Sequence, residues 1–148
     1  MFKKYFVLLS LVGVTLFSGC RSVPLASLKE DSTAKEFKTN PNAAQIYIYR
    51  NEILGGQIKI DVRLNGSEVG KTLQNTYMVL EVPPGKHKIE SESENTSTLE
   101  LTTEKGKNYF VWQEAKMGMW LARNKLQIVD EKTGKDGVLE CKRIQTVK

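Results

Sequence analysis

The sequence has few of the residues that usually carry chemistry. Its 148 residues include a single histidine, His87, and two cysteines, Cys20 and Cys141. A zinc site needs several clustered ligands, and a catalytic triad needs a histidine held beside a nucleophile. Two cysteines are also too few for the disulfide framework of a small exported domain. These shortages argue against metalloenzymes, triad hydrolases and disulfide scaffolds, and no cofactor or metal is expected.

Long apolar runs are also missing. The longest one, residues 5–17, is shorter than the roughly 20 residues that a membrane-spanning helix needs. Lys3 and Lys4 precede this run, and Ser-Gly-Cys follows it at residues 18–20. A basic start, a short apolar centre and small residues at the end are typical of a secretory signal peptide. The sequence therefore predicts that residues 1–19 direct export.

Cys20 changes this prediction from secretion to anchoring. Residues 16–20, Leu-Phe-Ser-Gly-Cys, resemble a bacterial lipobox, although Phe17 stands where leucine is usual. In a lipobox the thiol receives a diacylglycerol, the preceding bond is cut, and the new amino terminus is acylated. Each buried methylene contributes about 0.8 kcal/mol, so two or three chains anchor a protein firmly. Cys20 is the predicted lipidation site; the alternative is a plain signal peptide with a chance cysteine.

The charge pattern and the residue after Cys20 bear on partners and location. The net charge of +5 includes Lys3 and Lys4, and both signs are interspersed along the rest of the chain. Such a pattern is typical of a solvated surface, and no nucleic acid partner is expected. Gram-negative lipoproteins with Asp after the cysteine commonly stay at the inner membrane. Arg21 stands there, so the resemblance implies the outer membrane, facing the periplasm.

Residues 20–42 are predicted to form the lipidated cysteine and a flexible tether. They are rich in Ser, Lys, Glu and Thr, with a weak helical tendency over residues 25–37 and a break at residues 40–42. A segment with few large apolar side chains buries too little surface to offset its ordering entropy. Its expected role is to lift the domain off the bilayer.

Residues 43–148 are predicted to form one all-β domain. Ile58–Leu64 alternates apolar and polar residues, and Asn65-Gly66 directly after it is a strong hairpin signal. Pro83–Gly85 and residues 105–107 mark further turns. The expected strands cover residues 45–50, 58–64, 68–73, 77–82, 86–90, 98–103, 108–113, 126–130 and 137–141. This spacing indicates an antiparallel β-sandwich, immunoglobulin-like or prealbumin-like, with no helix inside the domain.

Several short motifs recur in a fixed order along this domain. They are Tyr47-Ile48-Tyr49-Arg50, Asn65-Gly66 with Val69-Gly70, Pro84-Gly85-Lys86-His87, and Gly106-Lys107-Asn108-Tyr109-Phe110. Together they resemble the bacterial domain-of-unknown-function 2846 family over residues 43–143, with Asn65 in place of Asp and Phe110 in place of Tyr. The resemblance implies a small exported β-sandwich, often a lipoprotein, and implies no activity.

The isolated polar residues are interpreted as structural. His87 is expected to stabilise a turn or to lie half-buried in a strand, in preference to acting as a ligand or base. Cys141 is expected to pack in the core; an intermolecular disulfide is the alternative, and a catalytic thiol is less favoured. Four carboxylates fall on the polar phase of strands, where a solvated face is expected: Asp61, Glu81, Glu90 and Glu92.

One apolar cluster has two interpretations. Met117, Met119, Trp120 and Leu121 lie in an irregular stretch between two expected strands. The preferred interpretation is a lid over the core. The alternative is an exposed interaction patch, to which methionine and tryptophan are suited.

The function predicted from the sequence is therefore not enzymatic. We expect a lipid-anchored cell-envelope protein, bound to the membrane through Cys20, whose domain serves as an interaction or structural module with an envelope protein as its candidate partner. The alternatives are a small-ligand carrier with a cavity between its sheets, or an enzyme whose site the motifs do not reveal.

Overall fold

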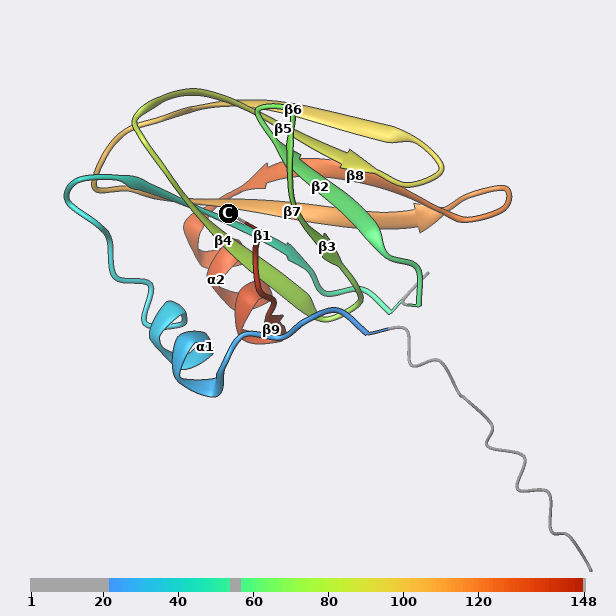
Figure 1. Ribbon diagram of the computed structural model, residues 1–148, viewed down its shortest axis with the longest axis horizontal. Coiled ribbons are helices and arrows are strands. Elements are labelled where there is room, and N and C mark those ends of the chain that lie inside the picture. Colours follow the sequence, from blue (N-terminus) through green and yellow to red (C-terminus); the bar gives the residue numbers. More distant parts are fainter. Residues whose placement is uncertain (1–21, 54–56, 148) are drawn as a thin grey trace, which may run out of the picture.

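The structure is a computed structural model that describes residues 22–53 and 57–147 (Figure 1). Residues 1–19 and Cys20 lie outside the described residues. The elements follow in the order α1 (Leu28–Ala34), β1 (Ala44–Arg50), β2 (Ile60–Leu64), β3 (Ser67–Thr72), β4 (Thr76–Val82), β5 (Gly85–Glu92), β6 (Thr96–Thr103), β7 (Asn108–Met117), β8 (Ala122–Val129), α2 (Glu131–Leu139) and β9 (Lys142–Arg143). Neither of these helices is long and apolar enough to cross a membrane.

The strands form two packed sheets, and the predicted β-sandwich is confirmed. One sheet has the order β8-β7-β1-β4-β9 and the other β3-β2-β5-β6. Most neighbours are antiparallel, but β1 pairs in parallel with β7, and β4 with β9. The first sheet is therefore mixed. Strands β5 and β6 of the second sheet come between β4 and β7 in the chain, and β7 then enters the first sheet parallel to β1. The Asn65-Gly66 hairpin is present, with φ of 51° and 87° as a two-residue turn needs.

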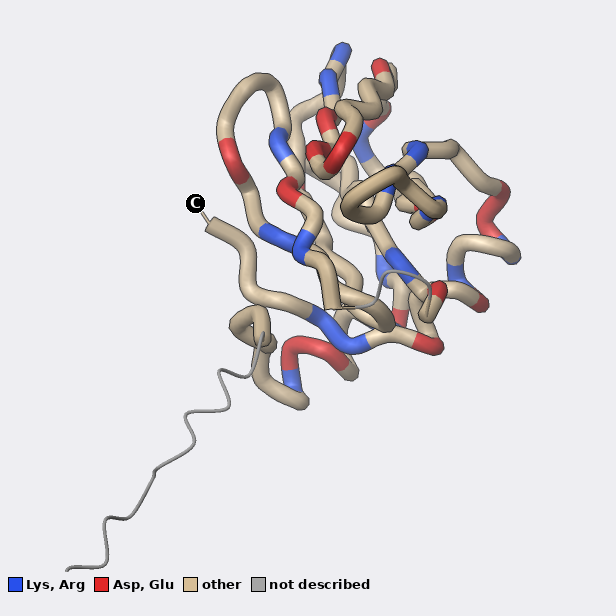
Figure 2. Tube along the Cα trace, turned by 90° about the vertical axis from the view of Figure 1, so that its right-hand side faces the viewer, with Lys and Arg blue, Asp and Glu red and all other residues tan. Residues whose placement is uncertain are grey.

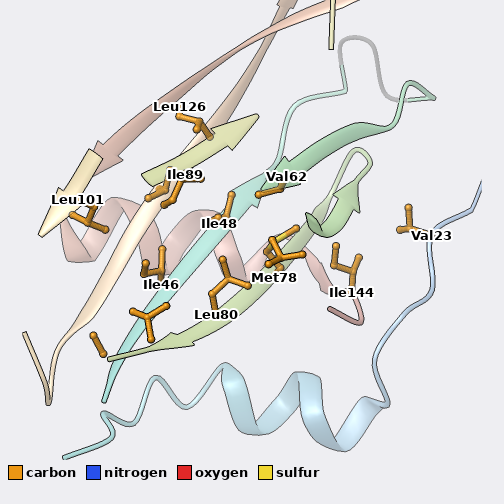
Figure 3. Close-up of a cluster of buried hydrophobic side chains, with 14 residues drawn as sticks. Val23, Ile46, Ile48, Val62, Met78, Leu80, Ile89, Leu101, Leu126 and Ile144 are labelled. Atoms are coloured by element: carbon orange, nitrogen blue, oxygen red, sulfur yellow. The ribbon is translucent and has the colours of Figure 1, made fainter. Parts of the chain in front are cut away.

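Strand β1 is buried on both faces, and its alternating side chains belong to two different apolar clusters. Ile46 and Ile48 face the second sheet, while Tyr47 and Tyr49 face outward. Figure 3 shows the cluster between the sheets, which includes Val62, Met78, Leu80, Ile89, Leu101 and Leu126. The outward cluster is mainly aromatic, with Tyr47, Tyr49, Tyr77, Phe110, Val138 and Cys141. We call these the aliphatic core and the aromatic cluster.

Helix α2 covers part of the aromatic cluster and was not expected. The sequence predicts a short strand at residues 137–141, and this prediction is wrong. The Asp130 side chain caps the helix by accepting from the Thr133 N–H at 2.9 Å. A Cβ on Gly134 would overlap Phe110, and a Cβ on Gly137 would overlap Tyr49. The two glycines thus let the helix approach the aromatic rings closely, although glycine is a poor helix former.

Residues 22–42 differ from the predicted tether, because they pack against the domain. Val23 is buried beside the core, near Ile144 in Figure 3. Residues 24–26 pair with residues 143–145 through two backbone hydrogen bonds, Ala26 N–H to Arg143 O and Gln145 N–H to Pro24 O, which form an antiparallel bridge between Leu25 and Ile144. The folded domain therefore includes Val23 and extends well before the start predicted at residue 43.

Helix α1 covers another part of the aromatic cluster, beside Tyr47 and Tyr77. Ser27 and Glu30 form a reciprocal capping box at its start. Asp31 then accepts hydrogen bonds from the Tyr77 hydroxyl and the Arg143 N–H, each at 2.9 Å. Burial acts to raise the pKa of Asp31, but these bonds and the Lys35 ammonium outweigh it and lower the pKa overall. The weak helical tendency in the sequence thus corresponds to an ordered, docked helix.

Candidate functional site

The apolar cluster at residues 117–121 forms the tip of the β7–β8 hairpin. Met117 pairs with Ala122, so residues 118–121 make the turn. The side chains of Met117, Met119, Trp120 and Leu121 are 75%, 80%, 86% and 52% exposed. We call these four residues the apolar tip. The preferred interpretation, a lid over the core, is wrong: the side chains project past the sandwich, and the alternative of an exposed patch describes them correctly.

Glu94, in the β5–β6 turn, holds the backbone of this tip. Its carboxylate accepts from the N–H groups of Met119, Trp120 and Leu121, at 2.9, 2.9 and 2.8 Å. These bonds favour the ionised form and lower the pKa of Glu94 to about 2. A Cβ at Gly118 would overlap the Glu94 carboxylate, so glycine permits the approach. The tip is therefore a fixed loop whose apolar side chains face solvent.

The surroundings of the tip carry more positive than negative charge. Lys116 lies 3.3 Å from Glu114, and Arg123 lies 3.9 Å from Glu94. Lys125 is exposed beside Glu114 on the neighbouring strand. Leu121 also lines an open hollow of about 290 Å³ with Gln57, Ile58 and Lys59. The basic side chains thus border the apolar tip on both strands and across the hollow.

A buried polar seam supports the base of the hairpin. Gln113 on β7 donates to the Ser91 hydroxyl at 2.6 Å and accepts from the Thr72 hydroxyl. Asn124 on β8 donates to the Ser93 hydroxyl at 2.8 Å and to the Ser91 carbonyl at 3.2 Å. Because these bonds join the two sheets inside the molecule, the seam fixes how the hairpin sits on the second sheet.

His87 is buried, and both of its ring nitrogens have partners. Nε2 lies 2.7 Å from the Pro83 carbonyl, to which it donates, and Nδ1 lies 2.9 Å from Asn65 Nδ2, from which it accepts. The Asn65 side chain also accepts from the Lys88 N–H at 2.9 Å. His87 thus ties the β2–β3 turn to the β4–β5 turn, which matches the turn-stabilising role expected from the sequence.

Cys141 is buried in the aromatic cluster, as expected. Its thiol donates to the Gly137 carbonyl at 3.3 Å, and burial raises the pKa of the thiol to about 12. A thiol with this pKa is protonated at neutral pH and is a weak nucleophile.

Arg50, the last residue of the Tyr47–Arg50 motif, and Glu52 form a second charged group for which the sequence suggested no role. Arg50 is fully buried, and its Nη1 donates to the Ile58 carbonyl at 2.7 Å. Burial raises the pKa of Glu52 and lowers that of Arg50. Arg50 could have been noticed in the sequence, because alternation puts it on the same face as Ile46 and Ile48. It braces the connection between β1 and β2 and is too deeply buried to meet a ligand.

The remaining carboxylates do not form a site. Each of the four singled out in the sequence has a polar or cationic neighbour at the surface: Asp61 with Lys71, Glu81 with Asn40, Glu90 with Lys88, and Glu92 with Arg63. Within residues 22–53 and 57–147, no three His, Cys, Asp or Glu side chains are placed to hold a metal ion.

Glu94, which fixes the backbone of the tip, is the residue of this candidate site that sequence reasoning missed. It stands in the polar run at residues 91–97, where nothing distinguishes it from the neighbouring acidic residues. Its role depends on the packing of two hairpins that are separated along the chain, so no local pattern could have indicated it.

Two comparisons place the chain among known sequences. Residues 40–124 match a family described as "Protein of unknown function (DUF2846)". An "Uncharacterized protein" of Haemophilus influenzae (strain ATCC 51907 / DSM 11121 / KW20 / Rd) is 35% identical over 139 residues, which is 92% of this chain and 83% of the relative. The match to this family confirms the resemblance seen in the motifs.

Proposed function

The chain belongs to the protein family of unknown function DUF2846, and we propose that it is a non-enzymatic, lipid-anchored cell-envelope protein. In this proposal its β-sandwich faces the periplasm and acts as a contact module. The observation that carries the proposal is the apolar tip, whose backbone is fixed by Glu94 and whose side chains no element within residues 22–53 and 57–147 covers. Exposed apolar groups of this kind mark interaction sites.

The strand edges of the sandwich support the tip as the contact surface. The outer edge of β3 is met by the carboxyl-terminal segment, whose Val147 N–H donates to the Val69 carbonyl at 2.9 Å. The outer edge of β9 is met by residues 24–26. At the β6 and β8 edges, the Leu126 N–H donates to the Ser97 hydroxyl at 2.9 Å. Strand addition by a partner would have to displace these contacts, whereas the tip is accessible as it stands.

The interior supports a contact module over the two alternatives. Aliphatic side chains and the buried polar seam of Gln113 and Asn124 occupy the space between the sheets, where a small-ligand carrier would need a cavity. His87 has both ring nitrogens in structural hydrogen bonds, and the Cys141 thiol is buried with a raised pKa. The groups best able to serve an enzyme are thus engaged in holding the fold.

The anchor is tested by labelling cells with a radioactive or clickable fatty acid. We expect label on the wild-type protein, and we expect Cys20→Ala to abolish it and leave unprocessed precursor. Fractionation of the labelled protein with the outer membrane would support the location that Arg21 implies. Label that survives the substitution would refute the anchor.

The contact surface is tested by photocrosslinking in intact cells. A diazirine side chain at position 119 should form adducts with protein or lipid. The matched control is the same side chain at Leu28, which is 88% exposed on α1. Equal adduct formation at both positions, or none at position 119, would contradict the assignment of the tip.

A further inference from the structure

We propose that the apolar tip inserts into the headgroup region of an anionic lipid bilayer, as a second membrane contact beside the acyl anchor. This inference rests on the proposed function, because it places the anchor at Cys20, and it names a lipid surface as what the tip contacts. Three observations carry it: the length of chain between the anchor and the folded unit, the position of the tip, and the chemistry around the tip.

The chain between the predicted anchor and the folded unit is very short. Val23 is buried, and the Pro24 carbonyl accepts from the Gln145 N–H at 2.8 Å. Only Arg21 lies between Cys20 and Ser22, where the described structure begins. An extended chain covers roughly 3.3–3.6 Å per residue, so Ser22 lies within about 7 Å of Cys20. The lipid anchor therefore brings the sandwich directly to the bilayer surface.

The tip and the start of the folded unit lie at the same end of the molecule. Gln57 lines one hollow with Ser22 and Val23, and it lines another with Leu121. In Figure 1 the β7–β8 hairpin (orange) projects on the right, and the blue start of the described chain lies in the same half. Figure 2 looks onto this side. An anchor beside Ser22 would thus direct this end toward the membrane.

The composition of the tip suits a membrane interface. Tryptophan is enriched at the level of the headgroups, and the unbranched methionines add flexible apolar surface. Lys59, Lys116 and Arg123 border the tip, and basic side chains are attracted to anionic lipids. The negative charges close by are Glu94, Glu114 and Glu52, of which Glu52 lies beside the backbone of Ala115. Glu94 is engaged by three backbone N–H groups and lies near Arg123, while Glu114 lies near Lys116.

The rigid backbone of the tip lowers the entropic cost of insertion. Glu94 already fixes the turn in the free protein, so the loop does not have to become ordered when it meets the lipid. The side chains of Met119 and Trp120 are also 80% and 86% exposed, which means that insertion breaks no existing packing. Binding of a soluble partner protein would not require the tip and the predicted anchor to lie at the same end of the molecule.

The first experiment measures vesicle binding without the anchor. The chain from residue 20 onward, carrying Cys20→Ser, is floated with vesicles of phosphatidylglycerol and phosphatidylethanolamine. We expect binding that weakens as salt rises. The double variant Met119→Ser/Trp120→Ser should need at least about tenfold more lipid than the parent protein for half-maximal binding. Leu28→Ser, the matched exposed apolar control, should bind as the parent does. Lys59→Gln and Lys116→Gln should each weaken binding about fivefold.

The second experiment uses the whole lipidated protein in vesicles that contain brominated lipids. Trp120 fluorescence should shift to the blue and be quenched, and Trp120→Phe should remove the quenched component and leave the emission of Trp112. No quenching of Trp120 in the anchored protein would overturn the proposal. So would flotation that is absent in the parent or unchanged in the double variant, and so would a photocrosslink from position 119 to one envelope protein without lipid adducts.

These outcomes separate the inference from the proposed function. Failure of fatty-acid labelling at Cys20 would remove the anchor but leave the flotation result standing, because that experiment uses the Cys20→Ser chain. Failure of flotation and quenching would remove the second membrane contact and leave the acylation of Cys20 intact.

Discussion

The aromatic cluster and the apolar tip are both apolar surfaces outside the aliphatic core, but only the aromatic cluster is covered. Helices α1 and α2 pack over Tyr47, Tyr77 and Phe110, which are at most 2% exposed. Trp120 in the tip is 86% exposed. Both surfaces are continuous with the first sheet, and β7 contributes to both through Phe110 and Met117. The aromatic cluster thus has a structural role, whereas the open surface of the tip is available for the contact that we propose.

The difference also lies in how each surface is held. The aromatic cluster is fixed by ring packing, with Phe110 stacked on Tyr47 at 5.1 Å between centroids and Phe37 edge-on to Phe110 at 5.8 Å. The tip is fixed through its backbone by the Glu94 carboxylate, which leaves its side chains without packing partners. Substitution of an apolar side chain should therefore lower the free energy of unfolding strongly in the aromatic cluster and hardly at all in the apolar tip.

The largest expected effect is that of Phe110→Ala. Removal of this buried ring should lower the free energy of unfolding by about 3–5 kcal/mol, because a cavity forms beneath α2. Chemical denaturation followed by circular dichroism measures the change. A loss of unfolding free energy below about 1 kcal/mol would mean that the packing of the helices does not depend on the aromatic cluster. The distinction between the aromatic cluster and the apolar tip would then fail.

A smaller but more specific effect is expected for Gly137→Ala. Alanine favours a helix by about 1 kcal/mol relative to glycine, yet the added Cβ would overlap the Tyr49 ring. Overpacking of this kind typically costs about 1–3 kcal/mol, so the variant should be destabilised. The control is Asp136→Ala, at an exposed position of the same helix, which should change stability by no more than about 0.5 kcal/mol. Stabilisation by Gly137→Ala would show that α2 does not approach the sheet closely.

Acid should loosen the tip at a pH that reflects Glu94. Its pKa in the folded protein is about 2, below the ordinary value of 4.5. The contribution of the carboxylate is therefore complete above pH 4.5 and is lost as the pH falls toward 2. The amide signals of residues 119–121 in nuclear magnetic resonance spectra should shift over this range. In Glu94→Gln the shift should be missing; if it persists, another group controls the turn.

The smallest effect on stability is expected for Trp120→Ala. Because the side chain is exposed, the free energy of unfolding should change by no more than about 0.5 kcal/mol. The same variant should weaken the crosslinking and membrane binding proposed for the tip. A loss as large as that of Phe110→Ala would place Trp120 in the core and remove the distinction between the two surfaces.

Much of the sandwich can be predicted because strands leave a local signal. Alternation along Ile58–Leu64 and the Asn65-Gly66 turn locate β2 and β3 within a few residues. Helix α2 could not be predicted in this way, because Gly134 and Gly137 resemble loop residues until the rings they contact are known. Docking of residues 22–42 was missed for a similar reason: it depends on a few contacts, such as Asp31 with Tyr77, within a polar segment.

The candidate site, too, could be predicted from the sequence only in part. The sequence identifies Met117 to Leu121 as an unusual apolar cluster, and it predicts a lipidation signal at Cys20. It could not decide between a lid and an exposed patch, because both have the same composition. Glu94 left no signal at all, since its partners lie on another hairpin.

The sequence by itself determined most of the strand pattern and the turns, because the alternation of side chains along a strand is a local property. The tertiary arrangement decided which apolar surfaces are covered. It placed helices over the aromatic cluster, docked residues 22–42 on the sandwich and left the tip in solvent. Coverage depends on contacts between segments far apart in the chain, and those contacts are set by the packing of the whole molecule.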